Sequence, residues 1–186
     1  MVDVVVIAGS AGGHDPLRRI IAALPVPCSA AVLVVMHIGP HPSFLPELLT
    51  QCGQHLATFA DNGEQIEAGH IYVAPPDHHM LLEAGRIRLD QGPKVHHTRP
   101  AADPLFISAA LSHVDRVMGI VLSGGDGDGA VGLRAIKHHG GMALVQAPEE
   151  AAVPSMPHAA LAADHPDAWL PVQELAQRVR AFCFVG

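Results

Sequence analysis

Residues 2–13, VDVVVIAGSAGG, carry the pattern that decides the fold. The run from Val2 to Ala8 is almost wholly apolar and β-branched, which is typical of a strand buried on both faces of a sheet. The glycine-rich turn 9–13 follows it, so the stretch predicts a strand that passes through a tight turn into a helix. The apolar stripe of that helix falls on Leu17, Ile20, Ile21 and Leu24.

The same strand and helix unit recurs along the chain. Further strands are predicted at 30–36, 56–59, 70–74, 117–122, 142–146 and 168–170. Further helices are predicted at 43–51, 103–111, 131–139, 156–163 and 172–182, with Phe44, Leu45, Leu48 and Leu49 facing inward and Asp103 as an N-cap. Ala84-Gly85 separates 80–83 from 86–89, which favours an antiparallel hairpin. We therefore predict an α/β fold: a doubly wound, mostly parallel sheet with helices on both faces and the hairpin at one edge.

Composition limits the classes of function. The chain has 186 residues, of which 49% are hydrophobic, and this suits one domain, 1–186, with a substantial core. Eleven Lys and Arg stand against eighteen Asp and Glu, and a net charge of −7 argues against a nucleic-acid partner. The three cysteines, Cys28, Cys52 and Cys183, form no CxxC pair, so we expect no disulfide framework and a reducing cytoplasm as the compartment.

Membrane insertion is not expected. Charged residues are absent between Arg19 and Glu47, but Pro25, Pro27, Gly39 and Pro40 divide this stretch into pieces too short to span a bilayer. The apolar run at the N-terminus has no basic segment ahead of it, so it does not resemble a signal peptide.

Three predicted strands end in groups that carry chemistry. The first leads into Ser10 and the second into His37, while 117–122 leads into a glycine-rich turn that contains Asp128. Ligands of doubly wound sheets gather at the carboxyl ends of the strands, so these side chains are expected to converge. A serine needs a base to take its proton, and that base needs a carboxylate to orient it. The pattern predicts a Ser10, His37 and Asp128 triad, with the N-terminus of the following helix near an oxyanion.

The same residues also allow other interpretations. Ser10 and Asp128 also suit a turn and a helix cap, and His37 suits a polar strand end. The histidine pairs 78–79, 96–97 and 138–139 are adjacent residues whose side chains diverge, so we predict no metal site. A calcium loop lacks its closing Glu, and a dinucleotide site lacks the acidic residue after the second strand.

Five separated blocks then carry a family resemblance. They are Gly9-Ser10-Ala11-Gly12-Gly13, His37 with Phe44, the segment 71–79, Arg99-Pro100 with Asp103 and 105–106, and Asp128-Gly129-Ala130 with Gly132. In this order they resemble the catalytic domain of CheB-type protein-glutamate methylesterases. Gly140-Gly141, Gln146 and Met156-Pro157 extend the resemblance over nearly the whole chain.

The resemblance implies hydrolysis of glutamyl methyl esters on chemoreceptors, and deamidation of receptor glutamines as a further reaction. Ser10 would be the nucleophile, His37 the general base and acid, and Asp128 the orienting carboxylate of an acyl-enzyme mechanism. Ala11, Gly12, Gly125 and Arg99 would lie on the substrate and oxyanion side. No metal or organic cofactor is implied, and the expected partner is the methylated cytoplasmic region of a chemoreceptor or a similar methylated protein.

Three positions depart from the family pattern. Ala11 stands where the family usually has Thr or Ser, Gly125 replaces a methionine, and Asp126 replaces a glycine. These changes leave open the alternative of a catalytically weakened module that binds a receptor or partner. Many relatives also carry a receiver domain ahead of the catalytic one, and this chain begins at the catalytic part. It would then be a stand-alone esterase, a subunit controlled by a separate receiver protein, or a fragment of a longer protein.

Overall fold

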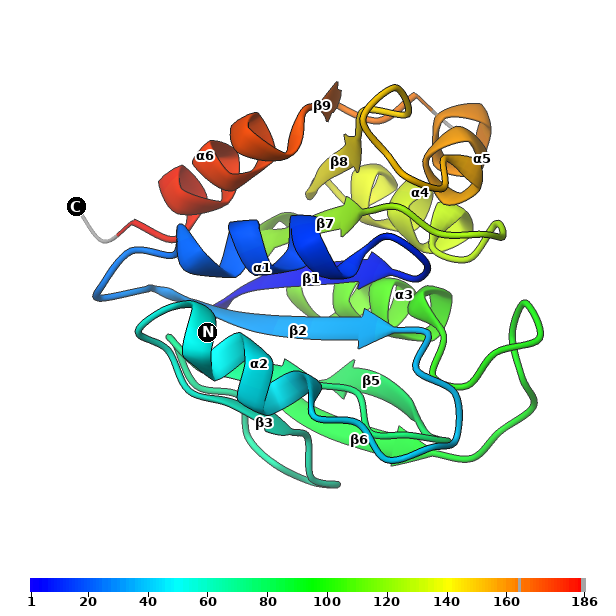
Figure 1. Cartoon of the computed structure of the whole chain (residues 1–186). Helices are drawn as coiled ribbons and strands as arrows, with labels where there is room; N and C mark the ends of the chain where they lie inside the picture. The colour runs from blue at the N-terminus through cyan, green and yellow to red at the C-terminus, as the bar shows by residue number, and fades with distance from the viewer. Residues whose placement is uncertain (164, 185–186) are drawn as a thin grey trace.

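A computed structural model describes residues 1–163 and 165–184 and shows a parallel sheet between two layers of helices (Figure 1). The strands are β1 (Asp3–Gly9), β2 (Ala30–Met36), β3 (Ala57–Phe59), β4 (Ile71–Val73), β5 (His79–Glu83), β6 (Arg86–Asp90), β7 (Val117–Val121), β8 (Met142–Gln146) and β9 (Ala168–Leu170). The helices are α1 (His14–Ala22), α2 (Leu45–Cys52), α3 (Ala102–His113), α4 (Ala130–His138), α5 (Ser155–Ala163) and α6 (Val172–Phe182), with a 3₁₀ turn at Val114–Arg116.

The main sheet has seven strands in the order β3-β4-β2-β1-β7-β8-β9, and every pair in it is parallel. The chain first builds outward from β1 through β2, and it later returns to the other side of β1 with β7. The strand order therefore reverses at β1, and crevices for ligands form at such reversal points. The predicted doubly wound α/β fold is confirmed.

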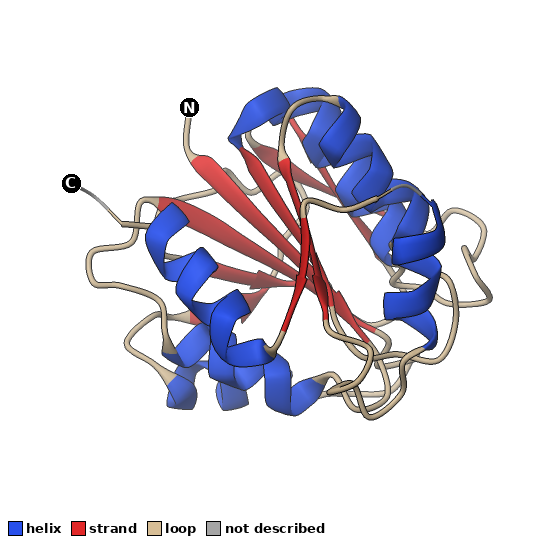
Figure 2. Ribbon diagram, turned by 90° about the horizontal axis from the view of Figure 1, so that it is seen from above, coloured by secondary structure: helices blue, strands red, loops and turns tan. Residues whose placement is uncertain are grey.

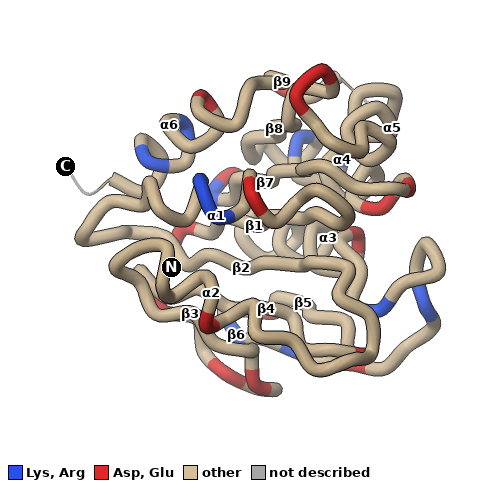
Figure 3. The backbone as a smooth tube through the Cα atoms, viewed as in Figure 1, with Lys and Arg blue, Asp and Glu red and all other residues tan. Residues whose placement is uncertain are grey.

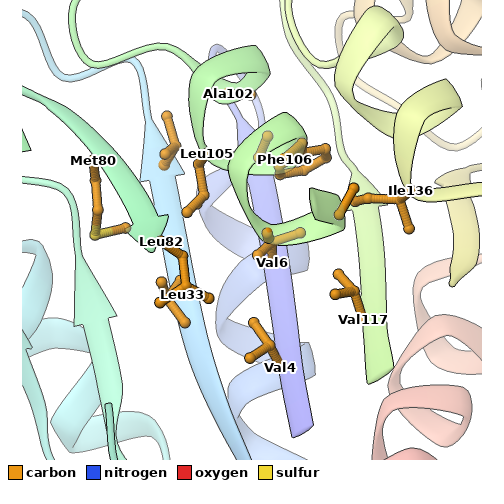
Figure 4. Packing of buried hydrophobic residues seen from close by; sticks show 14 of the residues in the cluster. Val4, Val6, Leu33, Met80, Leu82, Ala102, Leu105, Phe106, Val117 and Ile136 are labelled. Carbon is orange, nitrogen blue, oxygen red and sulfur yellow. The ribbon is translucent and has the colours of Figure 1, made fainter. Parts of the chain in front are cut away.

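The hairpin of β5 and β6 forms a separate two-stranded antiparallel sheet. It packs against α3, where the backbone N–H of Leu82 donates to Ser108 Oγ at 2.9 Å. Figure 4 shows Met80 and Leu82 of the hairpin beside Leu33 of β2 and Leu105 of α3. The antiparallel pairing is as predicted, but the hairpin packs under a helix and is not hydrogen-bonded to an edge of the large sheet.

Two apolar layers fill the space on either side of the sheet (Figure 2). Alternate residues of β1 face opposite layers: Val4 and Val6 lie in the layer with α3, α4 and α5, whereas Val5 and Ile7 lie in that with α1, α2 and α6. These four side chains are fully buried, and each such burial is worth roughly 1.5–3 kcal/mol. The continuous apolar run of β1 thus reflects a strand with helices on both faces.

The prediction for the second helix was partly wrong. Leu45 and Leu49 are buried as expected, but Phe44 is 75% exposed and Leu48 is 46% exposed. The helix begins at Leu45, so Phe44 precedes it and is not part of its apolar stripe. Leu45 and Leu49 pack into the apolar layer together, because residues four apart share one side of a helix.

Lys and Arg are scattered over the elements, as Figure 3 shows for one view. Several are paired with acids, including Arg88 with Glu83 and Asp90, and Arg116 with Asp3. Among the described residues, no helix combines the length and the apolar character that a bilayer crossing requires.

Candidate active site

The candidate residues lie just beyond the carboxyl ends of three neighbouring strands. Ser10 follows β1, His37 follows β2 and Asp128 lies in the loop after β7. Gly9 of β1 is the register partner of Met36 of β2, so Ser10 and His37 follow directly on adjacent strands. The backbone N–H of His37 donates to the Gly9 carbonyl at 3.2 Å, which keeps the two strand ends together. Asp128 lies in the loop after β7, the neighbour of β1 on its other side. The three segments therefore start at the same edge of the sheet, on β1 and its two neighbours. A triad of Ser10, His37 and Asp128 stays a prediction.

The turn that holds Ser10 is tight and depends on Gly12. The N–H of Ser10 donates to the Ser123 carbonyl at 2.9 Å, and the N–H of Gly13 donates back to the Ser10 carbonyl at 2.9 Å. Gly12 has a φ of +75°, and a Cβ there would lie 2.7 Å from both Ser123 Oγ and Ala152 Cβ. Conformation and space both require glycine at this position.

Ser123 and Gly124 contact the turn that holds Ser10. The fully buried Ser123 hydroxyl donates to the Ala11 carbonyl at 2.7 Å and accepts from the Val153 N–H at 2.9 Å. A Cβ on Gly124 would overlap Met156 Sδ and lie 3.0 Å from Ser10 Cβ. The turn that holds Ser10 therefore rests on the loop after β7 and on the start of α5, both distant in the sequence.

His37 and Asp128 form a direct contact. Nε2 of His37 lies 2.7 Å from Asp128 Oδ2, and the imidazole is only 9% exposed. Asp128 is fully buried, and its oxygens also accept the N–H groups of Ala102 at 2.6 Å and Asp103 at 3.0 Å. These groups belong to the first turn of α3, where backbone donors have no partner within the helix. Asp128 thus caps α3 from a distant loop while it contacts His37.

These contacts set the ionisation of Asp128. Burial alone raises the pKa of a carboxyl group, but hydrogen bonds from His37, Ala102 and Asp103 outweigh burial and hold the pKa of Asp128 below its ordinary value. The group is therefore a carboxylate at neutral pH, and it can orient an imidazole and stabilise its cation.

Asp103 does not cap its own helix, in contrast to the sequence prediction. The N-cap position of α3 is Ala101, and Asp103 lies inside the first turn. Its Oδ1 accepts the Gly132 N–H at 2.7 Å, and its Oδ2 lies 3.2 Å from His96 Nε2. Burial, together with the nearby charge of Asp128, raises the pKa of Asp103. Asp128 has taken the capping role, so Asp103 joins α3 to α4.

His96 is a member of the site region that the sequence did not single out. It lies with His97 in a two-residue turn with φ values of +49° and +63°, closed by mutual hydrogen bonds of Val95 and Thr98. His96, Asp103 and Asp128 offer ligand atoms within 4.8 Å of one another. The oxygens of Asp128 take part in three hydrogen bonds, and Asp103 Oδ1 accepts one. The two carboxylates of this cluster are therefore engaged in hydrogen bonds within the protein. A pair of adjacent histidines carries no local signal for this contact.

Comparison with known proteins decides the family. A family model described as CheB methylesterase matches residues 5–179. The chain belongs to the CheB methylesterase family. The solved CheB methylesterase catalytic domain of Thermotoga maritima is similar, with a TM-score of 0.92 and 29% sequence identity over 97% of this chain and 98% of that one. The resemblance seen in the sequence is confirmed.

The chain is also similar to two curated proteins, of which it covers different shares. A protein-glutamate methylesterase/protein-glutamine glutaminase 2 of Caulobacter vibrioides is 39% identical over 94% of this chain, which spans only 52% of that protein. A putative protein-glutamate methylesterase/protein-glutamine glutaminase of Leptospira interrogans is 34% identical over 94% of the chain and is covered to 92%. The chain thus spans about half of one relative and nearly all of the other.

The candidate oxyanion groups of this chain are backbone N–H groups. Within the described ranges, the N–H groups of Ala11, Gly12 and Gly125 donate to no protein acceptor. A Cβ on Gly125 would meet nothing within 4 Å, so the position that carries methionine in the family pattern faces open space. Free donors beside Ser10 suit a developing negative charge. Their role as an oxyanion hole stays a prediction.

Arg99, predicted on the substrate side, is held by the protein itself. Its Nε and Nη2 donate to Asp77 Oδ1 at 3.0 and 2.7 Å, and its Nη1 donates to the carbonyls of Gln91 and Gly92. The side chain is 19% exposed. These contacts join the loop ahead of α3 to the loop ahead of β5. A substrate contact for Arg99 stays a prediction beside this observed role.

Proposed function

We propose that this chain hydrolyses glutamyl methyl esters of chemoreceptors and releases methanol, with deamidation of receptor glutamines as a second reaction of the same site. The observation that carries the proposal is the 2.7 Å contact of buried Asp128 with His37, on the strand next to the one that ends at Ser10. Membership of the family and the names of the relatives support the same reaction class.

The first half of the mechanism forms an acyl-enzyme. Asp128 engages Nε2 of His37, so Nδ1 is the nitrogen that takes the proton of Ser10 as the serine oxygen attacks the glutamyl carbonyl. The negative oxygen of the tetrahedral intermediate is stabilised by free N–H groups of the turns, of which Ala11, Gly12 and Gly125 are the candidates. His37 then returns the proton to the methoxy group, and methanol leaves.

The second half regenerates the enzyme. His37 takes a proton from water, the resulting hydroxide attacks the acyl carbonyl, and Ser10 leaves with the proton that His37 holds. The products are a glutamate side chain and free Ser10. Each step uses only groups of this chain and water, so residues 1–186 are proposed to act as one catalytic unit, in the cytoplasm, on the methylated cytoplasmic region of a receptor.

The test is methanol release from a methylated chemoreceptor fragment, together with labelling of the enzyme by a fluorophosphonate. We expect release and labelling from the natural chain, and neither from Ser10→Ala. Ser112→Ala, a serine substitution in α3, is the matched control and keeps both activities. Labelling at Ser10 without methanol release would mean that the nucleophile is correct and the substrate is wrong. Absence of both, with the receptor fragment still bound, would favour the binding module.

A further inference from the structure

Cys28 and Cys183 lie together at the end of the domain opposite Ser10. Cys28 precedes β2, and Cys183 follows α6. The backbone pairs the two segments: Cys28 forms an isolated antiparallel bridge with Phe184, and the N–H of Ser29 donates to the Cys183 carbonyl at 3.0 Å. In Figure 1 the red end of α6 reaches the blue segment that leads into β2. Two parts of the chain that are far apart in the sequence are thus joined at a pair of cysteines.

The two thiols are in contact inside the protein. Cys28 is 6% exposed, Cys183 is fully buried, and both are free thiols in the apolar layer with α1, α2 and α6. The side chain of Cys183 is hydrogen-bonded to that of Cys28, and the Cys28 thiol donates to the Ala30 carbonyl at 3.3 Å. A disulfide spans Cα separations of roughly 4.4–6.8 Å, which neighbouring residues across an antiparallel bridge provide. A bond between the two sulfurs therefore requires little movement of the backbone.

The surroundings make the two sulfurs unequal. The hydrogen bond from Cys183 holds the pKa of Cys28 below its ordinary value, while the same contact, together with burial, raises the pKa of Cys183. The nitrogens of buried His55 lie 3.0 Å from the Gly69 carbonyl and 2.9 Å from the Pro25 carbonyl. A ring that donates to both carbonyls is charged, and this charge favours the Cys28 thiolate. The thiolate is the nucleophilic form, so Cys28 is the reactive member of the pair.

We propose that Cys28 and Cys183 form a reversible disulfide when the protein is exposed to a peroxide. The Cys28 thiolate attacks one oxygen of hydrogen peroxide and the O–O bond breaks, which leaves a sulfenic acid on Cys28. The hydroxide that departs takes up the proton released by the thiol and becomes water. The sulfur of Cys183 then attacks the sulfur of Cys28, and the sulfenic oxygen leaves with the Cys183 proton as a second water. The peroxide is reduced, and the two thiols are oxidised to one S–S bond.

The burial of the pair selects a small oxidant. Val26 is 61% exposed and Phe184 is 63% exposed, so the pair lies just beneath the surface. A slight local opening admits a molecule of the size of hydrogen peroxide to Cys28, but not a bulky disulfide. Disulfides of cytoplasmic proteins are typically transient, and a thiol reductant would return this one to two thiols.

The expected consequence is a more stable domain. A bond between Cys28 and Cys183 closes a loop that contains most of the chain, and such a loop restricts the unfolded state strongly. We expect the melting temperature of the oxidised protein to rise by about 5–15 °C. The pair lies at the amino ends of the strands, whereas Ser10 follows the carboxyl end of β1. The inference is therefore independent of the proposed function, and labelling of Ser10 should be equal in the two redox states.

The test compares the protein before and after treatment with hydrogen peroxide. Maleimide titration in denaturant should show that the three thiols fall to one, and peptide mapping should identify the Cys28 to Cys183 crosslink. Dithiothreitol should restore all three thiols and the original melting temperature. Cys52→Ser is the matched control and should keep the crosslink and the rise in melting temperature. Cys28→Ala and Cys183→Ala should lose both.

Three results would overturn the proposal. They are retention of all three thiols under peroxide that oxidises the urea-unfolded chain, a crosslink that involves Cys52, and a sulfinic acid on Cys28 without a crosslink. The peptide map of the natural chain decides even if an alanine variant does not fold. Fluorophosphonate labelling of the same samples separates the two proposals, because a chain that is never labelled at Ser10 refutes the proposed function and leaves the disulfide unaffected.

Discussion

Oδ2 of Asp128 lies 2.7 Å from Nε2 of His37 and 2.6 Å from the backbone nitrogen of Ala102. One carboxylate oxygen thus joins the imidazole to the first turn of α3. The orientation of the His37 ring and the packing of α3 depend on the same buried carboxylate.

Replacing Asp128 with Asn should abolish most of the activity. An amide presents its N–H or its oxygen to a ring that needs a charged acceptor, and it leaves the imidazolium without compensation. From the behaviour of serine triads we expect a loss of about 10³- to 10⁴-fold in turnover. Methanol release and fluorophosphonate labelling measure it, with Asp115→Asn as the control. A loss below about tenfold would show that Asp128 does not orient the base.

Asp128 also predicts how stability depends on pH. Its pKa is held below the ordinary value, so its contribution is complete above the unfolded value near 4 and is lost as the pH falls through the folded value. The stability of the natural chain against urea should therefore decrease as the pH falls below about 4. Asp128→Asn should be less stable at pH 7 and show a shallower decline. Parallel curves for the two proteins would contradict this.

Asp103 predicts the opposite sign. Burial raises its pKa, so the ionised form costs stability at neutral pH, and that cost disappears once the group is protonated in both states. Asp103→Asn keeps an oxygen for the Gly132 N–H and a partner for His96. We expect equal or greater stability at pH 7, by up to about 1 kcal/mol, and no gain below about pH 4. Urea unfolding of both proteins at pH 7 and below about pH 4 measures this difference in stability. A large loss of stability of Asp103→Asn at pH 7 would show that the charge of Asp103 is required.

Gly12→Ala and Gly63→Ala form a matched pair that tests the turn holding Ser10. Both glycines have a positive φ, but a Cβ on Gly12 would meet Ser123 and Ala152, while a Cβ on Gly63 would meet nothing within 4 Å. Gly63→Ala should cost about 1 kcal/mol for the backbone alone. Gly12→Ala adds overpacking and should cost about 2–4 kcal/mol, with loss of Ser10 labelling. Equal costs would mean that the turn has room to adapt.

Arg99 and Asp77 form a pair that a double-mutant cycle can resolve. If Arg99 acts by joining the two loops, Arg99→Ala and Asp77→Ala should raise KM by similar factors, and the double variant should add little to either. This is the outcome we expect, because the contacts of Arg99 go to Asp77 and to two carbonyls. A much larger rise in KM for Arg99→Ala would instead indicate that the guanidinium binds a carboxylate of the substrate.

The local patterns predicted most of the fold. The strands 30–36, 142–146 and 168–170 and the helix 172–182 have the observed bounds, because apolar runs and helical stripes mark their own ends. The side-chain contacts that join residues far apart in the sequence could not be predicted from local patterns. Asp103 has the sequence position of a cap, but Asp128 fills that role from 25 residues away. The contact of His96 with Asp103 likewise depends on how a loop folds over α3.

The sequence predicted the main residues of the candidate site but not all of their contacts. The strand ends and the family resemblance led to Ser10, His37 and Asp128, because parallel strands deliver their following residues to one edge. The Asp126 contact was not predicted. The sequence marks Asp126 only as a departure from the family pattern, whereas in the structure its Oδ2 lies 3.7 Å from His37 Nδ1. A side chain with several rotamers in a glycine-rich loop leaves its direction undetermined by sequence.

The cap that Asp128 provides for α3 also affects the order of events during thermal inactivation. Proteins open in cooperative parts as well as globally, and the part that opens most readily sets the first loss of function. If the first turn of α3 detaches, the N–H groups that hold Asp128 are gone while the seven-stranded sheet remains intact. Loss of the proposed activity would then precede the loss of far-ultraviolet circular dichroism, and amide exchange at Ala102 and Asp103 would report how often this turn opens.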